Sequence, residues 1–143
     1  MNQRAVSAVR ITPPYLSKEK MNTVENKALI QEAFTAWAND DGMAFFNLLA
    51  DPAIWTVRTF IGRQRLVDDA LVPQRAKLAG PPTPTLLNLT AEGDMVVIQW
   101  VGKGTTKAGQ PYNNSYCYVV HMKNGKVIRG TAYLDTELVR SIW

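Results

Sequence analysis

The second half of this 143-residue chain is a series of extended segments separated by short turns, and this series limits the fold more than any other feature. β-Branched and aromatic residues dominate the segments, while Glu92-Gly93-Asp94 and Asn124-Gly125 mark tight turns between them. Strands that follow one another through short turns pair in antiparallel directions. The series therefore predicts an antiparallel sheet with strands over residues 85–91, 95–102, 111–122 and 126–135.

Helical patterns fill most of the first half. Apolar residues recur at helical spacing in three segments, over residues 23–39, 43–49 and 64–79. One strand, over 54–60, separates the second helix from the third, and Pro73 predicts a kink in the third helix near Leu71-Val72. Helices, a strand, a helix and then a run of strands are typical of an α+β domain with its helices on one face of the sheet.

Residues 1–22 differ from the rest and are interpreted as an arm in front of a domain over 23–143. Pro13-Pro14 should block a helix, and no continuous apolar run resembles a secretory signal. The lack of acids before Glu19 is faintly similar to a transit peptide, and Met21 is an alternative start of the domain. The simplest interpretation is a surface extension or a partner contact.

Charge and composition argue against several classes of function. Residues 1–20 hold four of the sixteen basic side chains and one of the twelve acidic ones, so residues 21–143 carry a net charge of only +1. A nearly neutral body is not expected to bind nucleic acid, and no apolar run is long enough to span a membrane. One cysteine, Cys117, and one histidine, His121, offer no disulfide and no zinc site, which suits a cytoplasmic location. The chain contains no glycine-rich phosphate-binding motif, so no nucleotide cofactor is expected.

The last predicted strand carries the strongest candidates for chemistry. Side chains alternate between the two faces of a strand, so Tyr133 and Asp135 share one face with Thr131 and Arg129. A carboxylate in an apolar pocket beside a phenol is suited to moving a proton. The alternative is that Asp135 caps the segment 136–139 through its backbone N–H groups and that Tyr133 packs in the core.

Three local patterns, in their order and spacing, point to a family. They are the Gly62 turn that leads from the first strand into the third helix, the run Tyr112-Asn113-Asn114-Ser115-Tyr116, and Asn124-Gly125-Lys126-Val127 followed by Tyr133-Leu134-Asp135. Over residues 23–140 the chain thereby resembles the nuclear transport factor 2-like superfamily, in its branch of ketosteroid isomerases and SnoaL-like polyketide cyclases. The resemblance implies a cone-shaped α+β fold, in which a curved antiparallel sheet wraps around three helices and encloses an apolar pocket. It also implies a homodimer formed through the sheet.

The last three strands are also similar to the limonene epoxide hydrolase branch, and this implies which side chains face the pocket. The positions that correspond are Gln99, Val101, Asn114, Tyr116, Tyr118, Val120, Thr131, Tyr133 and Asp135. The Asp-Arg-Asp set of those hydrolases is incomplete, because Gln99 and Val101 stand at two of its positions. The carboxylates of the steroid isomerases are absent as well, since residues 57–60 contain none. Asp135 alone resembles the late aspartate of the polyketide cyclases.

Other side chains have a binding interpretation and a structural one. Five aromatic side chains would suit the wall of a pocket for a flat ligand, or would simply fill the core, namely Trp37, Trp55, Trp100, Tyr116 and Tyr118. Asn114, as an amide in a strand, needs partners, and Asp135, a water or a ligand would serve. By alternation His121 and Cys117 lie on the face opposite Tyr116 and Tyr118. Arg58 should point away from the pocket, and Arg129 should be a solvated or interface charge.

The sequence therefore predicts a cofactor-independent acid/base enzyme, namely a cyclase, isomerase or dehydratase. Its substrate would be a small hydrophobic or polyketide-like molecule in the cone. Asp135 would move the proton, while Tyr133 and Asn114 would orient the Asp135 side chain and stabilise charge. The alternative is a domain without catalysis that binds a small molecule or serves dimerisation. Neither a metal, a nucleic acid nor a membrane is expected as a partner.

Overall fold

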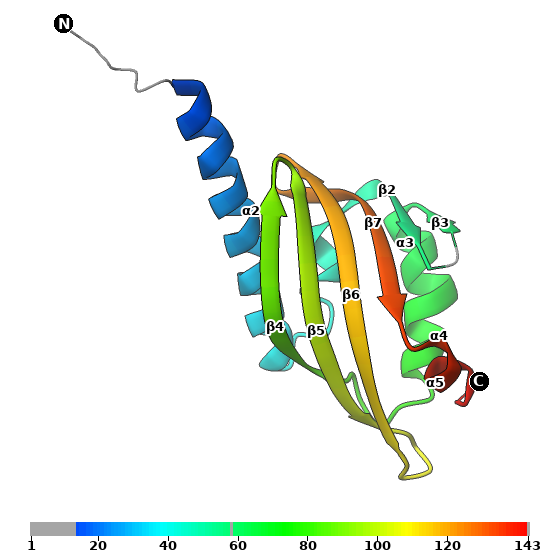
Figure 1. Cartoon of the computed structure of the whole chain (residues 1–143). Helices are drawn as coiled ribbons and strands as arrows, with labels where there is room; N and C mark the ends of the chain where they lie inside the picture. Colours follow the sequence, from blue (N-terminus) through cyan, green and yellow to red (C-terminus); the bar gives the residue numbers. More distant parts are fainter. Residues whose placement is uncertain (1–13, 58, 143) are drawn as a thin grey trace, which may run out of the picture.

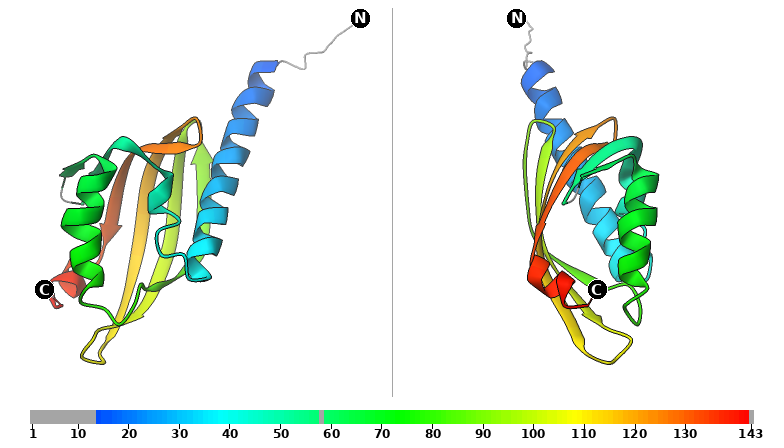
Figure 2. Two further views of the ribbon diagram at one scale, coloured as in Figure 1. Left: turned by 180° about the vertical axis from the view of Figure 1, so that it is seen from behind. Right: turned by 90° about the vertical axis from the view of Figure 1, so that its right-hand side faces the viewer.

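A curved sheet wraps around the helices in the computed structural model, which describes residues 14–57 and 59–142 (Figure 1). Within these residues six strands form one sheet in the order β3-β2-β7-β6-β5-β4. Their bounds are β2 Leu49–Thr56, β3 Thr59–Ile61, β4 Thr83–Glu92, β5 Met95–Thr105, β6 Pro111–Lys123 and β7 Lys126–Leu134. The helices are α2 Pro14–Ala38, α3 Arg63–Leu66, α4 Val72–Arg75 and α5 Thr136–Arg140. Figure 2 shows that α2, α3 and α4 lie on the concave side of the sheet.

Strands β4 to β7 form the expected antiparallel series. Gly93 and Gly125 take positive φ angles of 59° and 76° in two of the connecting turns, a conformation that glycine adopts without strain. Strand β2, however, pairs with β7 in parallel, so the sheet is mixed rather than wholly antiparallel. The chain between β2 and β7 holds helices and four strands, so no tight turn dictates their relative direction.

Helix α2 starts at Pro14, nine residues before Thr23, so the expected start of the first helix is wrong. Pro14 stands at the first position of α2, where a proline is tolerated because the backbone N–H it lacks would have no partner in the helix. Residues 1–13 of the predicted arm lie outside the described residues. Figure 1 shows that the N-terminal part of α2 extends past the sheet.

The second expected helix is wrong. Only a 3₁₀ turn forms, over Phe46–Leu48, and β2 then begins at Leu49, five residues earlier than expected. Asp51-Pro52 therefore lies within a strand. The pairing of β2 with β7 shifts register between Leu49 and Ile54, and such an irregularity tolerates a proline because no ladder hydrogen bond is needed there.

The third helix is present and is irregular where Pro73 predicts it. A π-helical segment, Val67–Leu71, joins α3 to α4. Proline lacks an N–H and crowds the carbonyl one turn before it, and a wider turn relieves both effects. The helix ends near Arg75 rather than Ala79. We call residues 63–75 the third helical segment below.

Aromatic side chains link α2, the 3₁₀ turn and the concave face of the sheet. Trp37 of α2 lies with its ring centroid 4.9 Å from that of Trp100, and Trp55 lies 4.9 Å from Tyr118. Trp100 stacks on Tyr116 at 3.9 Å with the two rings 9° from parallel. Aromatic rings therefore join the helices to the sheet within a core that also contains many aliphatic side chains. In the described part of the chain, no helix has both the length and the apolar character needed to cross a membrane.

Candidate functional site

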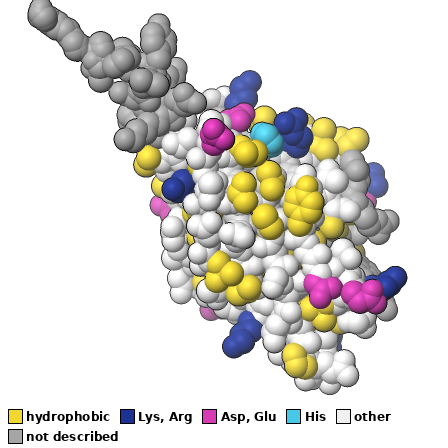
Figure 3. Space-filling view, viewed as in Figure 1, with side chains coloured by type: hydrophobic (Ala, Val, Ile, Leu, Met, Phe, Trp, Pro, Cys, Tyr) yellow, Lys and Arg dark blue, Asp and Glu magenta, His cyan; other side chains and the backbone are white. Residues whose placement is uncertain are grey.

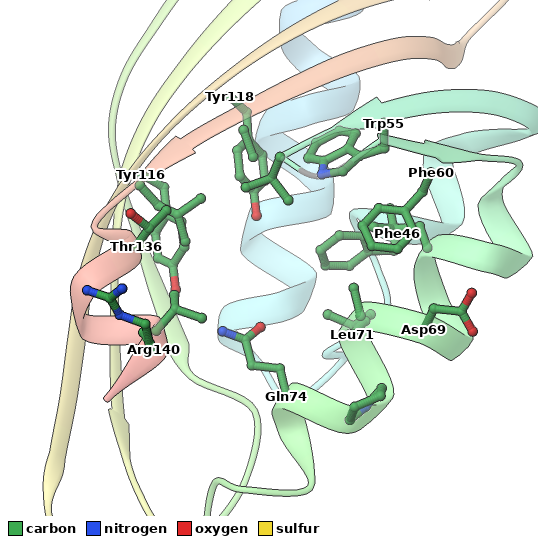
Figure 4. A pocket seen from close by; sticks show the side chains of 17 residues that line it. Phe46, Trp55, Phe60, Asp69, Leu71, Gln74, Tyr116, Tyr118, Thr136 and Arg140 are labelled. Carbon is green, nitrogen blue, oxygen red and sulfur yellow. The ribbon is translucent and has the colours of Figure 1, made fainter. Parts of the chain in front are cut away.

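A cavity of about 550 Å³ lies between the concave face of the sheet and the third helical segment (Figure 4). Its wall is mostly apolar and includes Phe46, Trp55, Phe60, Leu71, Ala132 and Leu134. Polar groups come from Tyr116 and Tyr118 of β6, Asp69 and Gln74 of the helical segment, and Thr136 and Arg140 of α5. A cavity of this size and character is typical of a site for a small organic molecule.

Tyr116 and Tyr118 are two residues apart on β6, so both lie on the concave face. Their phenol oxygens point away from the sheet (Figure 4). Burial raises the pKa of both phenols far above the usual range, and the phenol of Tyr112 adds to the effect. Both groups therefore keep their O–H at physiological pH. A neutral phenol in an apolar cavity is a hydrogen-bond donor for a carbonyl or anionic oxygen.

The charged side chains at the cavity each have an opposite charge beside them. Nε of Arg65 lies 2.7 Å from Oδ2 of Asp69, and Arg140 pairs with Glu137. Figure 4 shows the Asp69 carboxylate turned away from the aromatic wall. Asp69 is the only carboxylate among the described residues that line this cavity. The described chain also contains no group of three His, Cys, Asp or Glu side chains arranged to hold a metal.

Asn114 is buried and connects the end of β7 to β6. Its Oδ1 accepts hydrogen bonds from the backbone N–H groups of Asp135 at 3.1 Å and Ser115 at 2.8 Å. Its Nδ2 donates to the Asp135 carbonyl at 3.1 Å and to the Tyr112 hydroxyl at 3.3 Å. The expected partnership with Asp135 is thus present, through the backbone. Gln74, which lines the cavity, donates to the same Tyr112 hydroxyl at 2.9 Å.

The predicted pocket positions of Asp135, Tyr133 and Thr131 are wrong. Asp135 is exposed and caps α5, with its Oδ1 accepting from the Leu138 N–H at 3.1 Å, so the alternative interpretation of this residue holds. Tyr133 is 60% exposed, on the convex face of the sheet, and Thr131 lies on that face too. None of these three side chains lines the cavity.

The register between strands explains the error. Tyr118 is paired with Ala132 and Tyr116 with Leu134, and residues directly opposite each other in a ladder share a face. Because Tyr116 and Tyr118 face the cavity, the cavity side of β7 must hold Ala132 and Leu134. A shift of one residue exchanges the two faces of a strand. The alternation within each predicted strand was correct, but its phase on β7 was not.

The same shift makes the predicted pocket positions of Gln99 and Val101 wrong. Trp100 is paired with Tyr116, so Trp100 faces inward and its neighbours face outward. Gln99 is exposed, and its Oε1 accepts from Nδ2 of Asn88 at 3.1 Å. The apolar alternation of Val96, Ile98 and Trp100 was the signal in the sequence for the correct phase.

Trp55, Tyr116 and Tyr118 line the cavity, where the sequence analysis placed them, and their contact with a substrate stays a prediction. Trp37 and Trp100 do not line it but are buried. His121 points to the convex face as expected, with Nδ1 3.7 Å from Oδ1 of Asp94. The sequence analysis missed the contribution of the third helical segment, including Asp69 and Gln74. Helical spacing from Leu66 to Gln74 was the available signal.

Comparisons with known proteins support this fold. The family model described as SnoaL-like domain matches residues 30–130. A nuclear transport factor 2-like (NTF2-like) protein of Burkholderia thailandensis E264 is similar, with a TM-score of 0.68 and 20% identity over 82% of this chain and 95% of that one. A protein of Jannaschia sp. CCS1 named for a SnoaL-like polyketide cyclase has a TM-score of 0.67 and 16% identity over 84% and 92% of the two chains.

A third similar structure is TerC, crystallised with polyporic acid. Its TM-score is 0.67 and its identity 18%, over 81% of this chain and 98% of that one. No curated protein sequence matches the chain. At these identities the solved structures establish the fold, and the match to the family model covers most of the described domain.

The hydrogen bonds of Asn114 predict a large effect of its removal. In Asn114→Ala the Asp135 backbone and the Tyr112 hydroxyl lose buried partners, so the free energy of unfolding should fall by roughly 3 kcal/mol. Urea denaturation followed by circular dichroism measures this. The exposed neighbour Asn113, changed to Ala, should shift stability by less than about 0.5 kcal/mol. Equal losses in the two variants would contradict the role given to Asn114.

Proposed function

Because this chain belongs to the SnoaL-like domain family, we propose that its cavity binds a small, flat, hydrophobic molecule that carries a carbonyl or hydroxyl oxygen. The observation that carries this proposal is the pair of neutral phenols, Tyr116 and Tyr118, in a mostly apolar cavity of about 550 Å³. Trp55 and Phe46 offer flat apolar surface to a ring system. One phenol O–H would fix the ligand oxygen and so orient the ring.

The comparisons are consistent with such a ligand. TerC, which shares the fold, was crystallised with polyporic acid, and the Jannaschia protein carries the name of a polyketide cyclase. These descriptions concern those proteins, and they support a polyketide-like or similarly ringed ligand here. The cytoplasmic location expected from the single cysteine remains part of this proposal.

A second candidate function is cofactor-independent acid/base catalysis, and the position of Asp69 favours it. Asp69 lines the cavity that also holds the phenol of Tyr118. Released from Arg65 and turned toward the ligand, the Asp69 carboxylate would remove a proton next to the ligand carbonyl, and the electron pair would move to the carbonyl oxygen. The O–H of Tyr118 would stabilise the enolate, and return of the proton to another carbon would complete an isomerisation. The acid/base role thus moves from Asp135 to Asp69.

Homodimerisation through the convex face of the sheet is also part of the proposal. Figure 3 shows hydrophobic side chains gathered on this face. Val97 and Val119 are paired across β5 and β6 near its middle, and Cys117 and Tyr133 are paired across β6 and β7. Partly exposed apolar side chains on a sheet face are suited to packing against a second copy.

Ligand binding is tested first by removing the hydroxyl of a cavity tyrosine. A thermal-shift screen of polycyclic ketones and terpenoids identifies binders, since a bound ligand raises Tm by linkage. For a ketone such as 2-tetralone, Tyr118→Phe should weaken Kd roughly three- to tenfold through loss of one hydrogen bond. Tyr133→Phe removes an exposed hydroxyl on the other face and should leave Kd unchanged. Equal Kd values for wild type and Tyr118→Phe would argue against the proposed donor.

Catalysis is tested by exchange of ketone protons into D2O. NMR should show that the protein accelerates exchange at the carbons next to the carbonyl of 2-tetralone, and that Asp69→Asn lowers this rate at least about 100-fold. Asp135→Asn is the matched control, because asparagine caps a helix as well as aspartate and the rate should be unchanged. A rate that depends on Asp135 and not on Asp69 would reverse this assignment, and no acceleration at all would leave binding without turnover.

The proposed dimer is tested by a substitution that places a charge on the convex face. The wild-type protein should show twice the mass of one chain in light scattering, and Val119→Arg should show the mass of one chain, since an arginine would be buried between two copies. Val72→Arg is the control, because Val72 is 55% exposed on α4 and away from the convex face. A dimer that persists in Val119→Arg would place the interface elsewhere.

A further inference from the structure

Arg75 lies at the end of the third helical segment, directly behind the wall of the cavity. Its guanidinium carbon lies 5.7 Å from the centroid of the Phe46 ring, and Phe46 lines the cavity. On the same side it lies 5.3 Å from the ring of Trp37. Its Nη1 donates to the Gly42 carbonyl at 2.6 Å, whereas Nη2 is buried with no acceptor among the described residues.

The charge of Arg75 has no counter-ion in the described chain. The four ion pairs between described residues involve other side chains, and no described carboxylate lies within ion-pair distance of Arg75. Burial lowers the pKa of its guanidinium, and the ionisable groups that interact with it are the phenols of Tyr118 and Tyr116. Both phenols are neutral, because burial raises their pKa. A partly buried cation without a counter-charge is an unfavourable arrangement that a nearby negative charge would relieve.

The other charges at the cavity do not supply that negative charge. Asp69 is paired with Arg65, and Arg140 with Glu137, and in both pairs the side chains are largely solvated. Exposed pairs are screened by water, while a charge behind an apolar wall is screened much less. Arg75 is therefore the charge near the cavity that water screens least.

We propose that the cavity prefers ligands with an anionic oxygen, namely a carboxylate, an enolate or an acidic phenol, over neutral ligands of the same shape, and that Arg75 sets this preference. This inference rests on the proposed function, because it requires that the cavity take a small molecule. The anionic oxygen would accept hydrogen bonds from Tyr116 or Tyr118. Arg75 would act through space, behind the ring of Phe46, as a specificity-determining residue that does not touch the ligand.

Two probes of nearly equal shape test the preference in the wild-type chain. 2-Naphthoate is ionised at pH 7.5, whereas 2-naphthamide is neutral and keeps the carbonyl and the ring system. Isothermal titration calorimetry at low ionic strength should give a Kd for 2-naphthoate about tenfold lower, the size expected for attraction between unit charges across a protein wall. Equal Kd values for the two probes would overturn the inference and leave the proposed function intact. Binding of neither probe would contradict both.

Variants assign the preference to Arg75. Arg75→Met removes the charge and keeps the apolar stem, so the two probes should then bind with equal Kd, while Arg75→Lys should retain most of the preference. Arg129→Met is the matched control, since Arg129 is exposed on the convex face of the sheet and does not line the cavity, and it should leave the preference unchanged.

Two outcomes would overturn the assignment. They are a preference that survives in Arg75→Met, and one that is lost in Arg129→Met. If Arg75→Met does not fold by circular dichroism, Arg75→Gln takes its place, because its amide can still donate to the Gly42 carbonyl. The comparison of probes on the wild-type protein needs no variant at all.

Discussion

The packing of rings along β6 is the contact on which the rest of the molecule depends. Tyr116 stacks on Trp100 of β5, and Tyr118 packs edge-on against Trp55 of β2. Strand β6 therefore determines which residues face inward in the strands on both sides of it. Space for Trp55 exists because Gly130 has no side chain, and a Cβ built there would overlap the indole ring. The rings fill the narrow part of the curved sheet and leave the cavity beside them.

The polar groups around this cavity fall into two sets with different physical roles. Asn114, Tyr112 and Gln74 satisfy one another and the Asp135 backbone, so they stabilise the end of β7 and contribute little to a ligand. Tyr118 and Arg75 are left with a donor or a charge that the described protein does not match, whereas Tyr116 hydrogen-bonds with Tyr112. Buried polar groups normally have partners, and a site where they do not is the place where a ligand gains the most.

The family and the fold expected from the residues are confirmed, whereas the predicted positions of the chemistry are not. Asp135 follows the family's pattern in sequence, yet its carboxylate caps α5 and its backbone is bound by Asn114. The only described carboxylate on the cavity wall comes instead from the third helical segment. A residue can therefore keep its place in a motif for the local geometry of a strand end, while binding or catalysis depends on side chains of another element.

Sequence alone determined the elements that depend on neighbours in the chain. The turns at Gly93 and Gly125, the helix disturbance before Pro73 and the cap at Asp135 each follow from backbone preferences within a few residues. Only the tertiary structure decided which face of β7 meets the cavity, because alternation within a strand is the same in either phase and pairing with β6 selects one. It also decided that Arg75 lies behind Phe46 without a counter-charge, a consequence of packing between segments far apart in the chain.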